Sequence, residues 1–478
     1  MVFHPMRLCP RQDSSSTSWS SHWLRDSGNI IQYDFGGARL AYIPQHTINQ
    51  VASDENIRAV ISFDDSLSDC SSDTKNGLIT KIILSERRVF VICILGRISM
   101  KYLRVLLEED HVTDSELPIA EKRFTSGFAN SPYPLASFLR AQFRLEGLSQ
   151  MPAQGRFHQQ IDEAHTVPIS VKSRLYDSLR SNVYEMLIMF PGTNFPLPPG
   201  QDLVIKQAYS HATECGTERK FLQALADNNI SHPHIVTSYT GFQFRTAHYV
   251  VSERGSGNLL EFMTKYTDGA QAGLDYDWVV RQFMGLADAL SKIHGPTTKG
   301  NTGLYRNIGL DNILVFAKND MSLQDSTLKF CGWSYARMTA RESNEETSEA
   351  SSERASDESI IGTYNEHKPS EVIRGWNIAV SRDIECLGLA FLEVLVWFHE
   401  GEVKMSNFVE QHRYRWNDTA PGGMKLARTV QQKIEEIGDR GAEWKTLVDI
   451  IDQMLHVDVV NTSRVSDVVT ALGSLLGT

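Results

Sequence analysis

The sequence predicts an α+β protein in which a β-rich lobe is followed by a larger helical lobe. Apolar runs typical of strands occur at 183–190, 203–206 and 248–252. Farther along, residues 277–294 carry apolar side chains at helical spacing, and residues 384–398 are apolar on nearly every side, as in a buried helix. Strands first and helices afterwards favour two packed lobes over a βαβ sheet.

The composition is that of an ordinary folded chain. Its 478 residues are enough for two to three domains, and 41% are hydrophobic. The net charge of −11 disfavours nucleic acid as a partner, and the longest apolar run, residues 89–95, is far shorter than the ~20 residues of a membrane span. None of the six cysteines forms a C-x-x-C pair, so we expect reduced thiols in a cytoplasmic protein, with the nucleus as the alternative.

The N-terminal third predicts a separate accessory region. Residues 1–28 are serine-rich and aperiodic and predict a disordered tail, and residues 29–165 predict a small α/β or helical unit. Residues 78–84 and 89–95 are apolar runs that fit either strands or buried helical turns, because periodicity does not separate the two.

The rest of this region predicts helices joined by polar segments. Residues 100–109 and 135–145 have helical spacing, Pro132 and Pro134 indicate a loop between them, and residues 150–166 predict a linker.

One stretch inside the helical lobe departs from the surrounding composition. Residues 340–359 hold many acidic residues and serines and almost no apolar side chains. We expect a disordered insertion, which other kinases could phosphorylate because acidic side chains flank its serines.

The order of short motifs from residue 168 onward resembles the protein kinase superfamily. Leu203-Val204-Ile205-Lys206 is similar to the V-A-I-K strand, and Glu218 stands where the ion-pair partner of that lysine lies in the next helix. His232-Pro233-His234-Ile235-Val236 is similar to the turn into the following strand, and Val250 to Glu253 to the strand and hinge that hold adenine.

Further landmarks follow in the family's order. Residues 305–314 overlay the catalytic loop, and Pro369-Ser370-Glu371 overlays the end of the activation segment. Asp383 precedes the apolar run where kinases have a structural aspartate, and Arg464 stands where an arginine pairs with the glutamate of that segment, here Glu371.

This resemblance implies a bilobal kinase-like fold over residues 168–478. The small β-rich N-lobe would cover about 168–253 and the helical C-lobe about 257–478, with the insertion in the activation segment. The N-terminal region is also similar to the segment preceding the kinase domain in kinase-like proteins of filamentous fungi.

The sequence departs from a working kinase at its charged groups. Asn307 replaces the catalytic aspartate beside Arg306, Gly309 replaces the loop lysine, and Gly332 replaces the metal-binding aspartate of D-F-G. No glycine-rich loop precedes Lys206, and Val204 stands where alanine leaves room for adenine. Asparagine is not a base, and phosphoryl transfer depends on exactly these charges.

The surviving motif positions imply at most weak nucleotide binding. Val204, Lys206, Glu218, Glu253 and Asn312 are the candidate nucleotide-binding residues, and Asn312 is the one remaining candidate for contact with a metal. We therefore expect weak or no ATP binding and no productive Mg²⁺ site. The survivors have a structural interpretation as well, in which Lys206 and Glu218 simply bridge a strand and a helix.

The favoured hypothesis is a pseudokinase that binds protein partners in signalling, without nucleic acid or membrane. The first alternative is a divergent Ser/Thr protein kinase in which Asp311 or the acidic insertion supplies the missing carboxylates. A third possibility is phosphorylation of a small molecule on the same fold. The sequence identifies neither the partner nor the oligomeric state.

Overall fold

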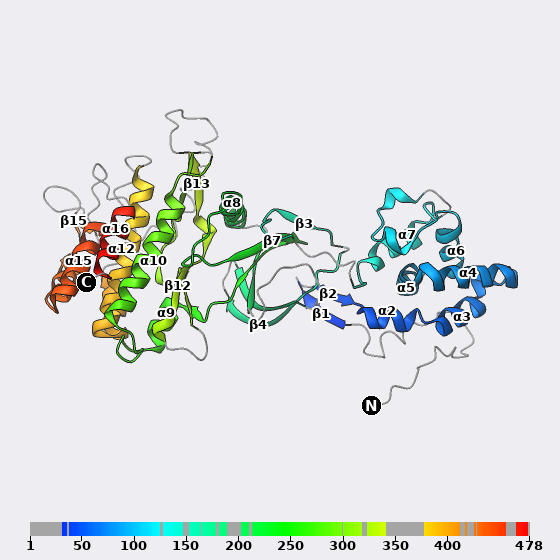
Figure 1. Ribbon diagram of the computed structural model, residues 1–478, viewed down its shortest axis with the longest axis horizontal. Coiled ribbons are helices and arrows are strands. Elements are labelled where there is room, and N and C mark those ends of the chain that lie inside the picture. The colour runs from blue at the N-terminus through cyan, green and yellow to red at the C-terminus, as the bar shows by residue number, and fades with distance from the viewer. Residues whose placement is uncertain are drawn as a thin grey trace. The chain divides into compact units, whose positions relative to one another are not determined.

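The computed structural model describes an α+β protein (Figure 1). The described residues are 31–35, 38–124, 128–146, 153–163, 165–177, 181–188, 202–209, 213–298, 300–317, 323–340, 377–411, 416–417, 425–426, 428–455 and 465–476. These ranges do not include residues 1–28, 341–376 or Arg464. The expectations for the disordered tail, for the insertion after Ala340 and for the pair of Glu371 with Arg464 therefore concern residues outside the described part of the chain. Ala340, the first residue assigned to the insertion, instead ends a strand.

The chain divides into two compact units, each built around its own core. The first unit comprises residues 1–154, 159–200 and 242–249, and the second comprises 155–158, 201–241 and 250–478.

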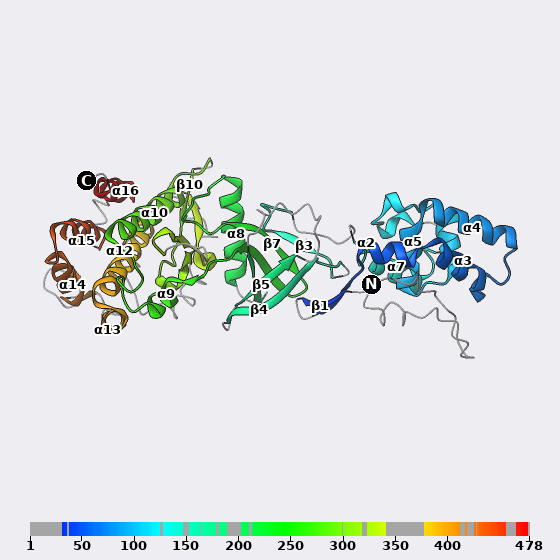
Figure 2. The same ribbon diagram turned by 60° about the horizontal axis from the view of Figure 1, so that its bottom comes forward.

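A cluster of helices forms most of the first unit (Figure 2). Their bounds are α2 Gln45–Val51, α3 Asp54–Phe63, α4 Ser72–Ser85, α5 Arg87–Gly96, α6 Met100–Glu108 and α7 Pro132–Gln142. Short 3-10 turns follow at Asp65–Leu67, Asp114–Glu116 and Glu121–Arg123. Their apolar faces form one core between Ile43 and Leu145.

The two ambiguous apolar runs of this unit are helical. Residues 78–84 lie in α4, which begins after Ser71, whose hydroxyl accepts a hydrogen bond from the backbone N–H of Thr74. Residues 89–95 lie in α5, which has Val89 to Cys93 buried in succession. A helix that is buried on most sides has an unbroken apolar run and no polar face. Its sequence therefore shows no helical periodicity that would distinguish it from a strand.

The expectation of a loop at Pro132 and Pro134 was wrong. Both prolines lie in the first turn of α7, where a missing backbone N–H costs no hydrogen bond and the fixed φ suits a helix. The predicted linker is also interrupted, because Gln159–Ile161 forms strand β3.

The largest sheet has the strand order β3-β7-β8-β6-β5-β4. The remaining strands are β4 Ile169–Asp177, β5 Ser181–Ile188, β6 Leu203–Tyr209, β7 Ser238–Phe244 and β8 Ala247–Glu253. Strand β3 is parallel to β7, and β4 is antiparallel to β5 with Ile169 opposite Ile188. A separate antiparallel hairpin joins β1 Ile31–Phe35 to β2 Ala38–Tyr42.

Helices dominate the second unit, most of them from residue 259 onward. They are α8 Thr213–Asp227, α9 Leu259–Lys265, α10 Tyr276–His294, α12 Asn377–Glu400, α13 Glu402–Gln411, α14 Arg428–Gly438, α15 Ala442–Leu455 and α16 Val465–Leu475. In this unit α10 packs on α16 and α12 packs on α13 and α15 (Figure 2). The predicted apolar run 384–398 lies within α12, and its buried side chains are part of the main core.

The second unit also contains short strands and turns. The strands are β9 Gly257–Asn258, β10 Asn301–Leu304, β11 Ile313–Phe316, β12 Thr327–Phe330, β13 Arg337–Ala340, β14 Trp416–Asn417 and β15 Lys425–Leu426. Turns of 3-10 helix lie at Leu310–Asn312, Leu323–Asp325 and Trp333–Tyr335. Strand β12 pairs with β11, and β10 pairs with β13.

Candidate functional site

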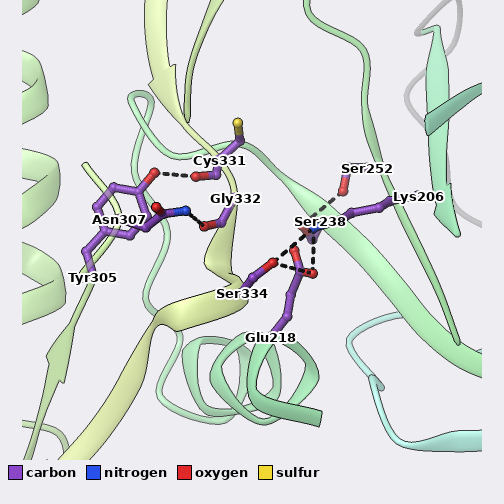
Figure 3. Close-up of polar contacts among 9 residues, drawn as sticks. All are labelled: Lys206, Glu218, Ser238, Ser252, Tyr305, Asn307, Cys331, Gly332 and Ser334. Carbon is purple, nitrogen blue, oxygen red and sulfur yellow. Dashed lines mark hydrogen bonds and ion pairs between the residues drawn. The ribbon is translucent and has the colours of Figure 1, made fainter. Parts of the chain in front are cut away.

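An ion pair joins strand β6 to helix α8. Leu203 and Ile205 are buried, whereas Val204 and Lys206 point to the opposite, half-buried face, as the alternation of a strand requires. Lys206 Nζ donates a hydrogen bond to Glu218 Oε2 at 2.7 Å (Figure 3). The Glu218 side chain is 8% exposed and the Lys206 side chain 23%.

A serine that the motif comparison did not single out completes this group. Ser334 Oγ lies 3.3 Å from Lys206 Nζ and 3.5 Å from Glu218 Oε2 (Figure 3). The three side chains converge from β6, α8 and the turn after β12. The ammonium of Lys206 therefore already has two oxygen partners within the chain. Ser334 follows Gly332 by two positions, and that spacing was the only sequence signal that could have found it.

Glu253, expected near adenine at the hinge, is bound by the chain itself. Its buried carboxylate accepts hydrogen bonds from Lys329 Nζ at 2.8 and 3.0 Å and from the backbone N–H of Thr237 at 2.7 Å. The Lys329 ammonium also lies 4.3 Å from the ring centroid of Phe316. These contacts connect the end of β8 to β11 and β12. Sequence reasoning missed Lys329, which has no neighbouring charge to indicate a partner.

Asp383 organises the backbone of the predicted catalytic loop. It is 1% exposed, and its carboxylate accepts hydrogen bonds from the backbone N–H groups of Tyr305 and Arg306, each at 2.7 Å. His294 Nε2 donates to the same carboxylate at 3.0 Å. Asp383 lies inside α12 and not before it, because that helix begins at Asn377.

Arg306 has a left-handed backbone. Its φ is 62°, a region in which L residues carry a steric penalty. The hydrogen bonds from the neighbouring amides to the buried Asp383 hold this conformation in place. These backbone hydrogen bonds therefore fix the conformation of the loop at Arg306.

Three residues at the expected metal position hydrogen-bond to one another. Asn307 Nδ2 donates to the carbonyl oxygen of Gly332 at 3.1 Å, and Asn312 Nδ2 donates to the carbonyl oxygen of Asn307 at 3.2 Å (Figure 3 shows the first contact). Gly332 has φ 76°, and a Cβ atom added there would lie 2.3 Å from Asn312 Oδ1. The carboxamide of Asn312 therefore fills the space that a side chain at position 332 would need.

A buried aromatic group lies against this loop. The Trp333 ring stacks on Phe221 at 5.4 Å between centroids and lies 4.7 Å from the Tyr305 ring. The Tyr305 hydroxyl donates to the carbonyl oxygen of Cys331. Burial raises the pKa of Tyr305 far above its ordinary range and that of the Cys331 thiol to about 12, so both stay protonated at neutral pH.

The donors at this position do not fit a catalytic magnesium ion. Mg²⁺ in nucleotide sites is held by one or two carboxylates, and positions 307, 312 and 332 supply two carboxamides and a glycine. The nearby carboxyl of Asp311 has its pKa raised, with desolvation as the first cause, although the residue as a whole is exposed. Among the described residues, no group of three or more His, Cys, Asp or Glu side chains could hold a metal ion.

Comparison with known proteins adds no relative. A scan against models of protein families yields no match for this chain, and a search of curated proteins yields none either. Within the described part of the chain, no helix combines the length and the apolar character needed to cross a membrane.

Proposed function

We propose that the chain is a pseudokinase, a bilobal kinase-like fold that serves as a binding or scaffolding module for protein partners in signalling. The observation that carries this proposal is that Asn307 donates to Gly332 and Asn312 donates to Asn307 at the positions where a kinase needs its base and metal-binding carboxylate. Without those charges, the electrostatic stabilisation that drives phosphoryl transfer is missing.

Two further contacts support the kinase-like fold. The Lys206–Glu218 pair joins a strand to a helix in the way that the motif resemblance implies, and Asp383 fixes the backbone of the loop at 305–306. In this proposal the N-lobe spans about 168–253 and the C-lobe about 257–478. The protein acts in the cytoplasm or the nucleus.

The intact Lys206–Glu218 pair also favours one alternative, a divergent Ser/Thr protein kinase. That alternative needs a carboxylate near Asn312, and Asp311 is its described candidate: Asn312 Nδ2 lies 3.4 Å from Asp311 Oδ1. A carboxylate from Asp311 would still leave the positions of the base and of the metal-binding aspartate, Asn307 and Gly332, without charge. We therefore rank it second.

Thermal unfolding with ATP, with and without Mg²⁺, tests the proposal. A ligand that binds only the native state raises Tm, by an amount that follows its concentration relative to Kd. We expect a small shift at most with ATP and no further shift with Mg²⁺. A large stabilisation that requires Mg²⁺ would instead support the divergent kinase.

A radiometric phosphotransfer assay with generic protein substrates gives the second test. We expect the unmutated protein to show no more turnover than Lys206→Met. We also expect no turnover from Asn307→Asp, because catalytic groups act as a unit and Gly332 still supplies no metal-binding carboxylate. Turnover that disappears with Lys206→Met would refute the pseudokinase proposal. Robust transfer after Asn307→Asp alone would show that the metal site has been misassigned.

A further inference from the structure

The β1–β2 hairpin inserts an aromatic ring into a cluster of rings from β7 and β8. Phe35, the last residue of β1, is 2% exposed. Its ring centroid lies 4.8 Å from that of Tyr249, 5.8 Å from Phe244 and 6.3 Å from Phe242. All three partners are buried, and Phe242 and Phe244 are two residues apart on one strand, so they share a face.

The other end of this segment is anchored in the helical cluster. Ile43, which follows β2, donates its backbone N–H to the carbonyl oxygen of Arg144 at 2.9 Å and accepts from the N–H of Glu146 at 3.0 Å. Its side chain is fully buried in the core of α2–α7. The intervening Leu40 and Tyr42 are buried as well. Residues 31–43 therefore pack through Phe35 on the rings of β7 and β8, and at Ile43 they are joined by two backbone hydrogen bonds to the segment after α7.

We propose that residues 31–43 act as an internal strap that couples the packing of the helical cluster α2–α7 to the stability of the β7–β8 hairpin. The aromatic face of Phe242, Phe244 and Tyr249 is the docking surface, and this segment of the same chain is its occupant. Strand β1 also packs against β4, so the strap reaches a second part of the large sheet. The inference involves no residue of the candidate site and does not depend on the proposed function.

Hydrogen exchange of the full chain measures the docking. We expect Phe35→Ala to speed amide exchange at residues 242–249 about tenfold or more, because it removes the buried ring that covers them. Tyr133→Ala is the matched control, since that aromatic side chain is 72% exposed. Exchange at 242–249 that is equal in Phe35→Ala and the unmutated protein would overturn the docking. If Phe35→Ala does not fold, Phe35→Leu should give a smaller increase at the same residues.

A double-mutant comparison measures this coupling. Phe138 is fully buried in the helical core, and Phe138→Leu should loosen that core without unfolding it. We expect Phe138→Leu to speed exchange at 242–249 when Phe35 is present, and to add nothing in the Phe35→Leu background. Exchange at 242–249 that does not respond to Phe138→Leu, or that responds equally in both backgrounds, would refute the strap.

Discussion

Gly332 shows how one residue can decide the chemistry of a site in two ways. It has no carboxylate where the kinase motif would place one, and a side chain added at this left-handed position would meet Asn312 Oδ1. Either Asn312 or the new side chain would have to move. The sequence could reveal the missing charge, but it could not reveal the occupied space, because that depends on a side chain twenty residues earlier, which the fold brings alongside.

The first prediction separates this collision from the cost of the left-handed backbone. Gly332→Ala should lower the free energy of unfolding by ~1–3 kcal/mol more than Gly273→Ala, as measured by urea unfolding. Gly273 has φ 67° and nothing within 4 Å of its added Cβ, so it carries the backbone penalty alone. Equal losses in the two variants would show that Asn312 yields without cost.

His234 makes stability depend on pH. Its Nδ1 donates to the carbonyl oxygen of Leu328 at 2.7 Å, and its Nε2 lies against Gly285. Burial is the main cause that lowers its pKa from 6.5 to about 4. Between these values the unfolded chain binds a proton that the folded protein does not, so stability falls as pH drops below 6.5 and levels off below about 4.

The second prediction follows from that sign. His234→Gln should reduce the loss of unfolding free energy between pH 7 and pH 5 by about 1–2 kcal/mol, measured by urea unfolding at both pH values. His46→Gln, at an exposed position, controls for the general effect of removing a histidine. A pH dependence that is the same in both variants would contradict the assignment to His234.

Among the elements, β6 and α8 are linked by a half-buried charge pair. The third prediction is that Lys206→Met lowers the free energy of unfolding by ~1–3 kcal/mol. The change leaves the carboxylate of Glu218, 8% exposed, with Ser334 as its remaining side-chain donor among the described residues. We place the loss below the range for fully buried pairs because Lys206 is 23% exposed. Urea unfolding measures it.

Lys445→Met is the control for this prediction. Lys445 pairs with Asp449 at 2.6 Å, but both side chains are about half exposed, so Lys445→Met should destabilise the protein much less than Lys206→Met does. If Lys206→Met and Lys445→Met destabilise the protein equally, the contact between β6 and α8 contributes no more than a surface pair.

The elements also show which features the sequence could predict. Strands β5, β6 and β8 and helices α6 and α10 form where apolar runs or helical spacing predicted them, within a few residues at their ends. The apolar run 384–398 lies inside α12, which begins seven residues earlier, at Asn377. The first turn of α7 was assigned to a loop because prolines are compatible with both. The contacts of Glu253 with Lys329 and of Ser334 with Lys206 join distant positions, and no local pattern encodes such partners.

At the scale of the whole molecule, the described residues form two apolar cores that share no residue. One lies between Ile43 and Leu145 and the other between Phe157 and Leu472. The fourth prediction is that calorimetry resolves two transitions, since cores that share no residues need not melt together.

Two matched leucines assign these transitions. Leu103 and Leu447 are both fully buried, one in each core. Leu103→Ala should lower the melting temperature of only one transition, that of the core between Ile43 and Leu145. Leu447→Ala should lower only that of the core between Phe157 and Leu472. Each change should reduce the unfolding free energy of its own core by ~2–5 kcal/mol. A single transition that both variants lower alike would show one cooperative unit.

The buried Trp333 gives the candidate site an optical signal. Its indole, 2% exposed, is in contact with Tyr305 and Phe221 and follows Gly332 directly, so its fluorescence emission should be that of an indole shielded from water. The difference spectrum between the unmutated protein and Trp333→Phe isolates this emission from the other seven tryptophans. A compound that displaces Asn312 from Gly332 would change the wavelength or intensity of the Trp333 emission. Ligands of this site can therefore be screened without a substrate or a catalytic reaction.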